Sequence, residues 1–364
     1  MHTTSAIRKT QRGMSLVELL VAAAIGIIAS LAIFQVFAVF EAQKRTTTSG
    51  GEAQTSGTLA LFTVERELRQ AGYGINNLTY LGCKIQGRDS LSGTNFTLEM
   101  VPVMITQGAA GAPDTITVMY GNGDLLPNPA SINQNMPSAS SVFKVANPYG
   151  FQEGDIVIAA EAGKDCTLAQ VSGLPGAPNP NGDVIHNPGT FTDPTTGVQK
   201  DTRYNPSAVP PGGIPYTTNA KLFNIGQLPS NNIYSVQNGQ LVQQQALFGA
   251  VPPGTTPLYD GIVQLQAQYG KDTNNNGVVD VFDEITPATT AEWAQVLAVR
   301  VAVVARSGLY EKEEVSPATI RLWENSAAAP TTTGPVWTLT ADDRHYRYKV
   351  FQTVVPLRNL IWKP

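Results

Sequence analysis

The feature that most limits how this chain can fold is a long apolar run close to its N-terminus. Between Leu19 and Phe40 there is no charged residue, and only a glycine, a serine and a glutamine interrupt the apolar side chains. About 20 apolar residues, at ~1.5 Å each, cross the ~30 Å hydrocarbon core of a bilayer. The preceding residues 1–13 carry three basic side chains and no acidic one. The positive-inside rule keeps this leader in the cytoplasm and sends the rest of the chain across the membrane.

Glu18 helps to separate the interpretations of this segment. A secretory signal peptide has an apolar core of about 7–15 residues followed by a small-residue cleavage site, and the run here is longer. A plain signal anchor gives no reason for a carboxylate at the start of the span. A charge inside a membrane segment costs at least ~2.5–3.5 kcal/mol on insertion scales, and such residues are usually functional and partnered.

The residues around Glu18 favour a third interpretation. The segment Arg12–Val21, with the sequence RGMSLVELLV, closely resembles the class III signal of type IV pilins and pseudopilins. The resemblance implies that the prepilin peptidase cuts between Gly13 and Met14, and that Met14 becomes N-methylated. It also implies that Glu18 is the fifth residue of the mature chain. The family usually has Phe at the first mature position, where this chain has Met14.

A role for Glu18 follows from this processing. Cleavage gives Met14 a free amine, which is a cation at the level of the membrane. The Glu18 carboxylate of a neighbouring subunit can pair with that amine, which lowers the desolvation cost of both groups and sets the register of two helices. The alternative is that Glu18 only extends to the membrane interface.

The spacing of apolar residues predicts one long N-terminal helix over residues 14–71, of which residues 14–40 span the membrane. The segment Thr46–Gly51 (TTTSGG) ends in two glycines, which lower helix stability, so we expect a melted or kinked middle. Only the part after it is expected to pack on a globular domain. Gly72 or Gly74 is a natural stop for the helix.

After the helix, in residues 72–364, the hydrophobic period changes from 3.6 to 2, which predicts strands. The clearest cover residues 115–120, 263–269, 296–306 and 346–355, and Pro356 must end the last strand or lie on a sheet edge. We expect alternate glutamines in the second of these, and the arginines Arg300 and Arg306 in the third, on outer faces. The fold class is α+β, and it matches the pilin-like architecture that the signal implies. That architecture is a long N-terminal transmembrane helix packed on an antiparallel β-sheet domain with long loops.

One segment of this exported domain has a loop-like composition. Residues 174–215 hold nine prolines and six glycines in 42 residues. Such a composition predicts a long surface loop or insertion, and we assign no chemistry to it.

Short segments further along the chain are similar to PilW-type minor pilins. They are 67–73 (ELRQAGY), 269–272 (YGKD), 299–301 (VRV) and 357–359 (LRN). Together, in this order and on a chain of this length, they favour PilW over a major pilin. The resemblance implies a minor pilin that takes part in type IV pilus assembly and initiation, and that supports fibre biogenesis, twitching motility and adhesion.

The same resemblance implies partners and a location. The partners are other minor pilins and the major pilin, the prepilin peptidase as processing enzyme, the inner-membrane pilus assembly machinery and a pilus-tip adhesin. The location is the bacterial inner membrane, crossed once with the C-terminal domain in the periplasm, and then the pilus at the cell surface.

Two alternatives stay open: a minor pseudopilin of a type II secretion system, and a membrane-anchored periplasmic ligand-binding module. Cleavage after Gly13 would argue against the second.

Composition argues against several other functions. The net charge is −4, and removal of the leader takes the 24 Lys and Arg to 21 against 28 Asp and Glu, a net charge of −7. No basic footprint for nucleic acid is left. The three histidines are far apart, and phosphate-binding, dinucleotide, nucleophile-elbow and zinc-hydrolase motifs are all missing. We therefore expect no enzymatic activity and no nucleic-acid partner.

Cys83 and Cys166 are the two cysteines of the chain, and both fall on the exported side of the predicted span. In an oxidising compartment an even pair normally closes, so we expect a Cys83–Cys166 disulfide. The loop of ~83 residues corresponds to ~4–5 kcal/mol in the chain-entropy model. The alternative is two buried free thiols.

The segment 272–283 (DTNNNGVVDVFD) fits a calcium loop of the EF-hand type. Such a loop supplies oxygen ligands at positions 1, 3, 5, 7, 9 and 12, with a glycine at position 6 for the sharp turn. Gly277 is the sixth residue here, and the ligand positions are Asp272, Asn274, Asn276, the Val278 carbonyl, Asp280 and Asp283. Asp at position 12 replaces the usual Glu and resembles dockerin-type loops, and a strand enters the loop where an EF-hand has a helix. We expect a structural Ca²⁺ here; the alternative is an Asn/Gly turn without an ion.

Overall fold

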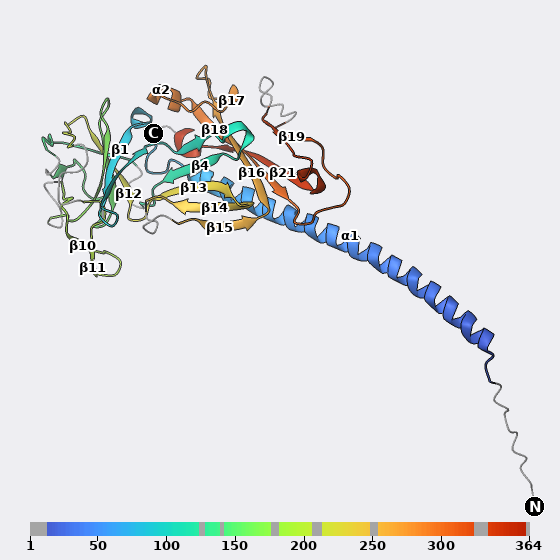
Figure 1. Cartoon of the computed structure of the whole chain (residues 1–364). Helices are drawn as coiled ribbons and strands as arrows, with labels where there is room; N and C mark the ends of the chain where they lie inside the picture. The colour runs from blue at the N-terminus through green and yellow to red at the C-terminus, as the bar shows by residue number, and fades with distance from the viewer. Residues whose placement is uncertain are drawn as a thin grey trace, which may run out of the picture. The chain divides into compact units, whose positions relative to one another are not determined.

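The computed structural model describes residues 13–123, 128–138, 142–175, 182–205, 213–247, 254–323 and 334–361. The chain divides into two units, residues 1–52 and residues 53–364. The first holds most of one long helix, and the second holds the end of that helix and all the strands (Figure 1).

The helix α1 runs from Leu16 to Gln70. It is helical at every residue through Gly50 and Gly51, so the expected melted middle is wrong. Each glycine costs a helix about 1 kcal/mol relative to alanine, and the cooperativity of a helix this long absorbs that cost. The end of α1 is as predicted, because Gly72 has φ +82° and takes the left-handed conformation that commonly terminates a helix.

The strands of the second unit form three main sheets. The six-stranded sheet has the order β2-β1-β8-β7-β12-β5, the five-stranded sheet β15-β14-β13-β4-β3, and the four-stranded sheet β17-β16-β18-β21. The first comprises β1 (Lys84–Asp89), β2 (Thr94–Glu99), β5 (Ala130–Ser131), β7 (Ile156–Ala160), β8 (Cys166–Gln170) and β12 (Lys221–Gly226). The second comprises β3 (Val103–Thr106), β4 (Thr115–Tyr120), β13 (Ser230–Gln237), β14 (Gln240–Gln245) and β15 (Thr256–Asp260). The third comprises β16 (Ile262–Lys271), β17 (Val281–Asp283), β18 (Val296–Arg306) and β21 (Tyr348–Pro356).

Short elements complete the described part of this unit. Three small strand pairs are β6 (Phe143–Lys144) with β9 (Asp183–Val184), β10 (Thr190–Thr192) with β11 (Gln199–Asp201), and β19 (Thr319–Arg321) with β20 (Val336–Thr338). The short helices are η1 (Leu78–Tyr80), η2 (Ala109–Gly111), α2 (Thr290–Trp293), η3 (Asp343–His345) and α3 (Arg358–Ile361). The pairs in the main sheets are antiparallel except that β1 and β8 run parallel, so the predicted α+β class is confirmed.

The strongest strand predictions are confirmed, but the environment of two of them is not as predicted. β4 and β18 have the predicted bounds, and β21 lies at a sheet edge and ends at Pro356. The glutamines of β16, however, are at most 7% exposed, and Arg300 of β18 is 1% exposed. The expected outer face of β16 is therefore covered, because backbone carbonyls of residues 111 and 112 accept hydrogen bonds from Gln264 and Gln266. Arg306 of β18, by contrast, is partly exposed.

The main core of the second unit lies between the end of α1 and two of the sheets. The buried face of the helix is made of small and medium side chains: Ala53, Gly57, Ala60, Val64, Leu68 and Ala71. They pack with buried residues of β3, β4, β13, β14, β16, β18 and β21. Leu59 and Phe62 lie on the opposite side, 44% and 60% exposed. Small residues on the inner face allow the helix axis to lie close to the sheets.

The Pro/Gly-rich segment 174–215 is not a bare loop in its described part. It contains β9, β10 and β11, and Val184, Phe191 and Tyr204 are at most 8% exposed. Residues 176–181 and 206–212 lie outside the described residues. The composition hid these buried positions, because they are single apolar residues between turns and have no periodic pattern.

Candidate functional site

The processing site lies at the start of α1. Residues 1–12 of the predicted leader lie outside the described residues, whereas Gly13 and Met14 are exposed and precede the helix. Ser15 and Glu18 form a capping box: the Ser15 N–H donates to Glu18 Oε2 at 2.9 Å, and the Glu18 N–H donates to Ser15 Oγ at 3.2 Å. A Ser and a Glu three residues apart satisfy two of the free N–H groups that every helix start has.

This capping box was missed by the interpretation of Glu18 from sequence. The S-x-x-E spacing of Ser15 and Glu18 by itself indicates a capping box. The resemblance to a pilin signal instead predicted a partner for Glu18 in another subunit. Glu18 therefore has a partner within its own first turn.

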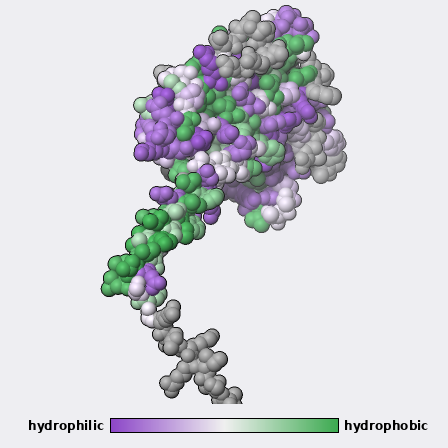
Figure 2. Space-filling model, turned by 90° about the vertical axis from the view of Figure 1, so that its right-hand side faces the viewer, coloured by the Kyte–Doolittle hydropathy of each residue, from purple (hydrophilic) through white to green (hydrophobic). Residues whose placement is uncertain are grey.

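From Leu19 to Phe40 the first unit is an apolar helix surface. Large apolar side chains from Leu16 to Phe40 are 53–76% exposed, and the face in view in Figure 2 is almost continuously hydrophobic along this segment. α1 is long and apolar enough to cross a membrane. An apolar groove of about 350 Å³ runs along it, lined by Ala32, Ile33, Val36, Phe37 and Phe40. A helix surface with this composition is stable against lipid tails or against other apolar helices.

A buried carboxylate fastens the end of α1 to the five-stranded sheet. Glu67 is 5% exposed, and its Oε2 accepts hydrogen bonds from Asn232 Nδ2 at 2.8 Å and from the Tyr120 hydroxyl at 3.0 Å. Arg66 lies 3.4 Å from the other oxygen. Burial raises the pKa of Tyr120, as does the neighbouring charge of Glu67. The group specifies how the helix docks, and it was not found from sequence because its partners are far apart in the chain.

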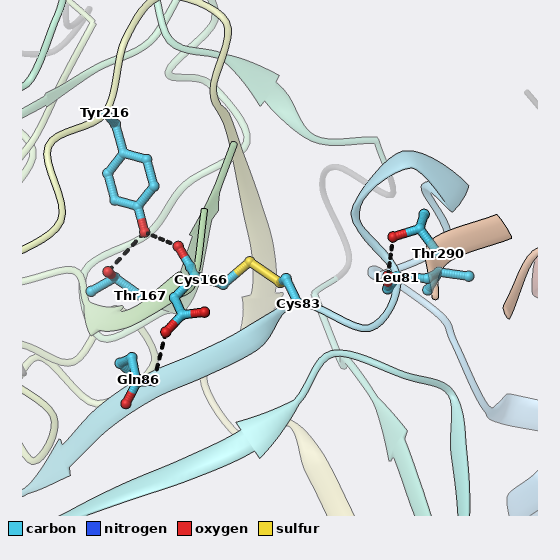
Figure 3. Close-up of a disulfide and its surroundings, with 8 residues drawn as sticks. Leu81, Cys83, Gln86, Cys166, Thr167, Tyr216 and Thr290 are labelled. Carbon is cyan, nitrogen blue, oxygen red and sulfur yellow. Dashed lines mark hydrogen bonds between the residues drawn. A yellow bond between two sulfur atoms is a disulfide. The ribbon is translucent and has the colours of Figure 1, made fainter. Parts of the chain in front are cut away.

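The predicted disulfide is present between Cys83 and Cys166, with a Cα–Cα distance of 5.8 Å (Figure 3). It lies beside the parallel β1–β8 pair, in which Ile85 is opposite Cys166. Tyr216 lies close by in Figure 3, and its hydroxyl is 2.8 Å from Thr167 Oγ1. The parallel β1–β8 pairing covers two residue pairs, Ile85 with Cys166 and Gln86 with Thr167. A covalent crosslink beside it stabilises this short pairing.

The Asx-rich loop 272–283 is closed by its own side chains. Asp272 is 5% exposed, and its two oxygens accept the N–H groups of Asn276 and Gly277 at 3.0 and 2.7 Å. Asp280 Oδ2 accepts the N–H groups of Thr273 and Asn274 at 2.8 and 3.2 Å. Both carboxylates therefore lie on the inner side of the turn. Gly277 has φ +84°, the sharp turn that position 6 of the loop requires.

The last predicted ligand is held differently. Asp283 belongs to β17, and its Oδ1 lies 2.7 Å from Lys271 Nζ in an ion pair. Among the described residues, no three His, Cys, Asp or Glu side chains gather in an arrangement that could hold a metal ion. Desolvation acts to raise the pKa of Asp280, but the hydrogen bonds from Thr273 and Asn274 together outweigh it, and the pKa is lowered. Asp280 thus offers ionised oxygens, and Asp283 would have to leave Lys271 to join them.

Two family models match this chain. Residues 224–359 match the type IV pilus-assembly protein W family, PilW, and residues 8–34 match the prokaryotic N-terminal methylation motif. The first match includes the segments 269–272, 299–301 and 357–359, on which the resemblance to PilW partly rested. The second includes Gly13, Met14 and Glu18. No curated protein and no solved structure gives a significant match.

Proposed function

We propose that this chain, a PilW-like prepilin with a class III signal, is a minor pilin that takes part in starting the assembly of a type IV pilus. The observation that carries the proposal is the combination of two features in one chain. The methylation motif includes the first part of an exposed apolar helix, from Leu16 onward, and a PilW-type match follows it in the chain. In this role the protein is a structural subunit and a substrate of the prepilin peptidase.

The apolar helix supports a role in assembly. Between subunits in a membrane or a fibre, its uncharged surface packs against equivalent helices without a desolvation cost. Glu18 supplies the one ionisable side chain of residues 14–40, and the new amine of Met14 in a neighbouring subunit is its proposed partner. The other minor pilins and the major pilin are the proposed neighbours, and the exported domain, in the periplasm before assembly, is the part available to the assembly machinery and to a tip adhesin. Contributions to twitching motility and adhesion follow from fibre formation.

The processing step tests this proposal directly. Mass spectrometry of the N-terminus of the membrane-fraction protein should find residue 14 as the first residue, carrying an N-methyl group. Replacing Gly13 by leucine should block cleavage, because the peptidase must accept a small residue beside the scissile bond, whereas Gly26→Leu should leave it unchanged. A mature N-terminus within or after the apolar run would contradict the proposal.

A second experiment separates the pilus from the two alternatives. Deletion of the chain should reduce the number of surface fibres, and the full chain should restore them. A defect in protein secretion with normal fibres would instead indicate a type II pseudopilin. Normal fibres and normal secretion would leave the anchored ligand-binding module.

We also propose that the loop 272–283 binds a structural Ca²⁺. The support is the ligand spacing, the turn at Gly277, and the inward position of the Asp272 and Asp280 carboxylates. The ion would replace the hydrogen bonds that now close the loop and would draw Asp283 from Lys271. It would fix the connection between β16 and β17, and assembly would then depend on calcium.

Thermal unfolding of the detergent-solubilised mature chain tests the calcium proposal. The transition should rise in temperature with calcium and fall with a chelator, and the double variant Asp272→Ala/Asp280→Ala should lose this response. Asp201→Ala, which removes an exposed carboxylate from β11, is the control and should keep it. If the unaltered chain melts at the same temperature in both conditions, the loop is only a turn.

A further inference from the structure

The Cys83–Cys166 bridge can be approached from one side. Cys83 is partly exposed and lines a pocket of about 310 Å³, whereas Cys166 is 0% exposed. The pocket walls come from η1, from the connection between β7 and β8 at residues 161–165, and from Thr290 of α2. In Figure 3 the Cys83 end of the bridge lies toward Leu81 and Thr290, and the Thr290 hydroxyl donates a hydrogen bond to the Leu81 carbonyl at 2.9 Å. A reagent in this pocket therefore reaches the sulfur of Cys83 before that of Cys166.

The charged residues that line the pocket are two lysines, Lys84 and Lys164, and two carboxylates, Glu161 and Asp165. Asp165 accepts a hydrogen bond from Gln86 Nε2 at 3.0 Å. Lys84 follows Cys83 directly, lines the pocket and is exposed, and no ion pair to its ammonium group is found in the described part of the chain. The second lysine, Lys164, is held by Glu161 at 2.9 Å and by the Pro215 carbonyl at 2.8 Å. Lys84 is thus the cation available to an incoming anion. A thiolate is such an anion, and it is the nucleophile of thiol–disulfide exchange.

We propose that Cys83 is the modification site of this bridge, where a thiolate exchanges with the disulfide. The reagent is a small thiol or the catalytic thiol of a thiol–disulfide oxidoreductase. Its thiolate attacks Cys83 Sγ, a mixed disulfide forms at Cys83, and the Cys83–Cys166 bond breaks. The electron pair goes to Cys166, which takes a proton from water. A second reagent thiolate then attacks the reagent sulfur of the mixed disulfide, the bond to Cys83 Sγ breaks, and Cys83 leaves as a thiolate that takes a proton from water. The two reagent thiols supply the two electrons and end as their own disulfide.

The surroundings of Cys166 set the direction and speed of this exchange. Cys166 belongs to an apolar cluster that includes Ile85, Ile158 and Leu168. A thiolate is poorly solvated there, which makes Cys166 an unfavourable leaving group. Reduction of the folded chain is therefore slow. In the reverse reaction an oxidase forms its mixed disulfide with Cys83, and Cys166 resolves it.

Partial reduction of the native protein tests the site of attack. The mature full-length chain in detergent is exposed briefly to reduced glutathione, quenched in acid and alkylated under denaturing conditions, and the peptides are analysed by mass spectrometry. Glutathione should be found on Cys83, with Cys166 alkylated, in excess over the opposite adduct, because access to Cys83 outweighs the poorer leaving group that Cys166 makes. Equal adducts, an excess on Cys166, or no adduct where the unfolded chain reacts would overturn the proposal.

A lysine variant tests the charge of the pocket. Lys84→Gln should lower the exchange rate with glutathione several-fold more than the rate with cysteamine, whose thiolate carries a compensating ammonium group. Lys349→Gln, which removes an exposed lysine from β21, is the matched control and should leave the ratio of the two rates unchanged. A ratio that is the same in Lys84→Gln and in the unaltered chain would refute the role of Lys84.

Discussion

Asp114 is a buried carboxyl group that joins two sheets. It lies just before β4 and is 1% exposed. Its Oδ1 accepts the Gly108 N–H at 2.9 Å, and its Oδ2 accepts the Ala267 N–H of β16 at 2.8 Å. Burial raises the pKa of Asp114 to about 6, and the two N–H groups act in the opposite direction without compensating for it. The Asp114 carboxyl group therefore ionises at a pH near 6, where the stability of the folded chain can be measured.

The expected effect on stability has a definite sign. The folded-state pKa of Asp114 is raised from 3.8. Its stabilising contribution to the free energy of unfolding is therefore complete below pH 3.8 and is lost as the pH rises through about 6. A shift of about two units corresponds to about 3 kcal/mol of unfolding free energy. Asp114→Asn should remove this part of the pH dependence between pH 4 and pH 7, as measured by denaturant unfolding. Asp201→Asn should leave it unchanged, and an identical pH profile for Asp114→Asn would contradict the assignment.

Other single residues show what sequence pattern leaves undetermined. The period of β16 correctly predicted a strand, but it could not show that residues 111 and 112 cover its glutamine face. Arg300 is similar: its guanidinium lies 4.7 Å from the Phe282 ring and 4.4 Å from the Trp323 ring. Burial lowers its pKa to about 10. Polar residues at alternate positions predict an outer face only when no other segment packs over it.

At the scale of the element, Gly57 sets how closely α1 lies to β21. A Cβ atom built at Gly57 would lie 2.1 Å from Cε2 of Phe351, whereas one at Gly50 of the same helix would meet no atom within 4 Å. The two glycines thus have different reasons to be in the helix. Gly57 lies against the ring of Phe351, a sheet residue that a larger side chain would displace, whereas Gly50 faces open space.

This difference gives a prediction with an internal control. Gly57→Ala should lower the unfolding free energy, because overpacking costs about 1–3 kcal/mol while alanine returns only about 1 kcal/mol of helix propensity. Gly50→Ala should be neutral or stabilising for the same helical reason. Unfolding in denaturant measures both, and Phe351→Leu should restore much of the loss in Gly57→Ala. Equal stability of the two alanine variants would refute the contact.

At the scale of the whole molecule, the sequence was informative where a local pattern carries the signal. The leader, the apolar span, the helix end at Gly72 and the longest strands each depend on neighbours in the chain. The order of strands in the three sheets and the parallel β1–β8 pair beside the disulfide depend instead on residues that are far apart in the chain. The docking of Glu67 on Tyr120 and Asn232 joins residues from three distant parts of the sequence. Such contacts are set by packing, which no short motif records.

Glu18 has two separable roles, one within the chain and one between chains. Within the chain it completes the capping box with Ser15, a role that glutamine also fills. Between chains its charge is proposed to pair with the Met14 amine of a neighbour, which glutamine cannot do as an ion. Substitution by glutamine and by alanine therefore distinguishes the two roles.

We expect both Glu18→Gln and Glu18→Ala to be cleaved after Gly13, since the peptidase site precedes the substitution. Both variants should be retained in the membrane fraction and be strongly reduced in sheared fibres, because both lack the charge that pairs with the neighbouring amine. Immunoblots of the two fractions measure this, and Ser15→Ala, which removes the Oγ of the capping box and keeps the charge, is the matched control and should still enter fibres. If Glu18→Gln enters fibres normally while Glu18→Ala does not, the residue acts through the helix start alone, and the ion pair between subunits is excluded.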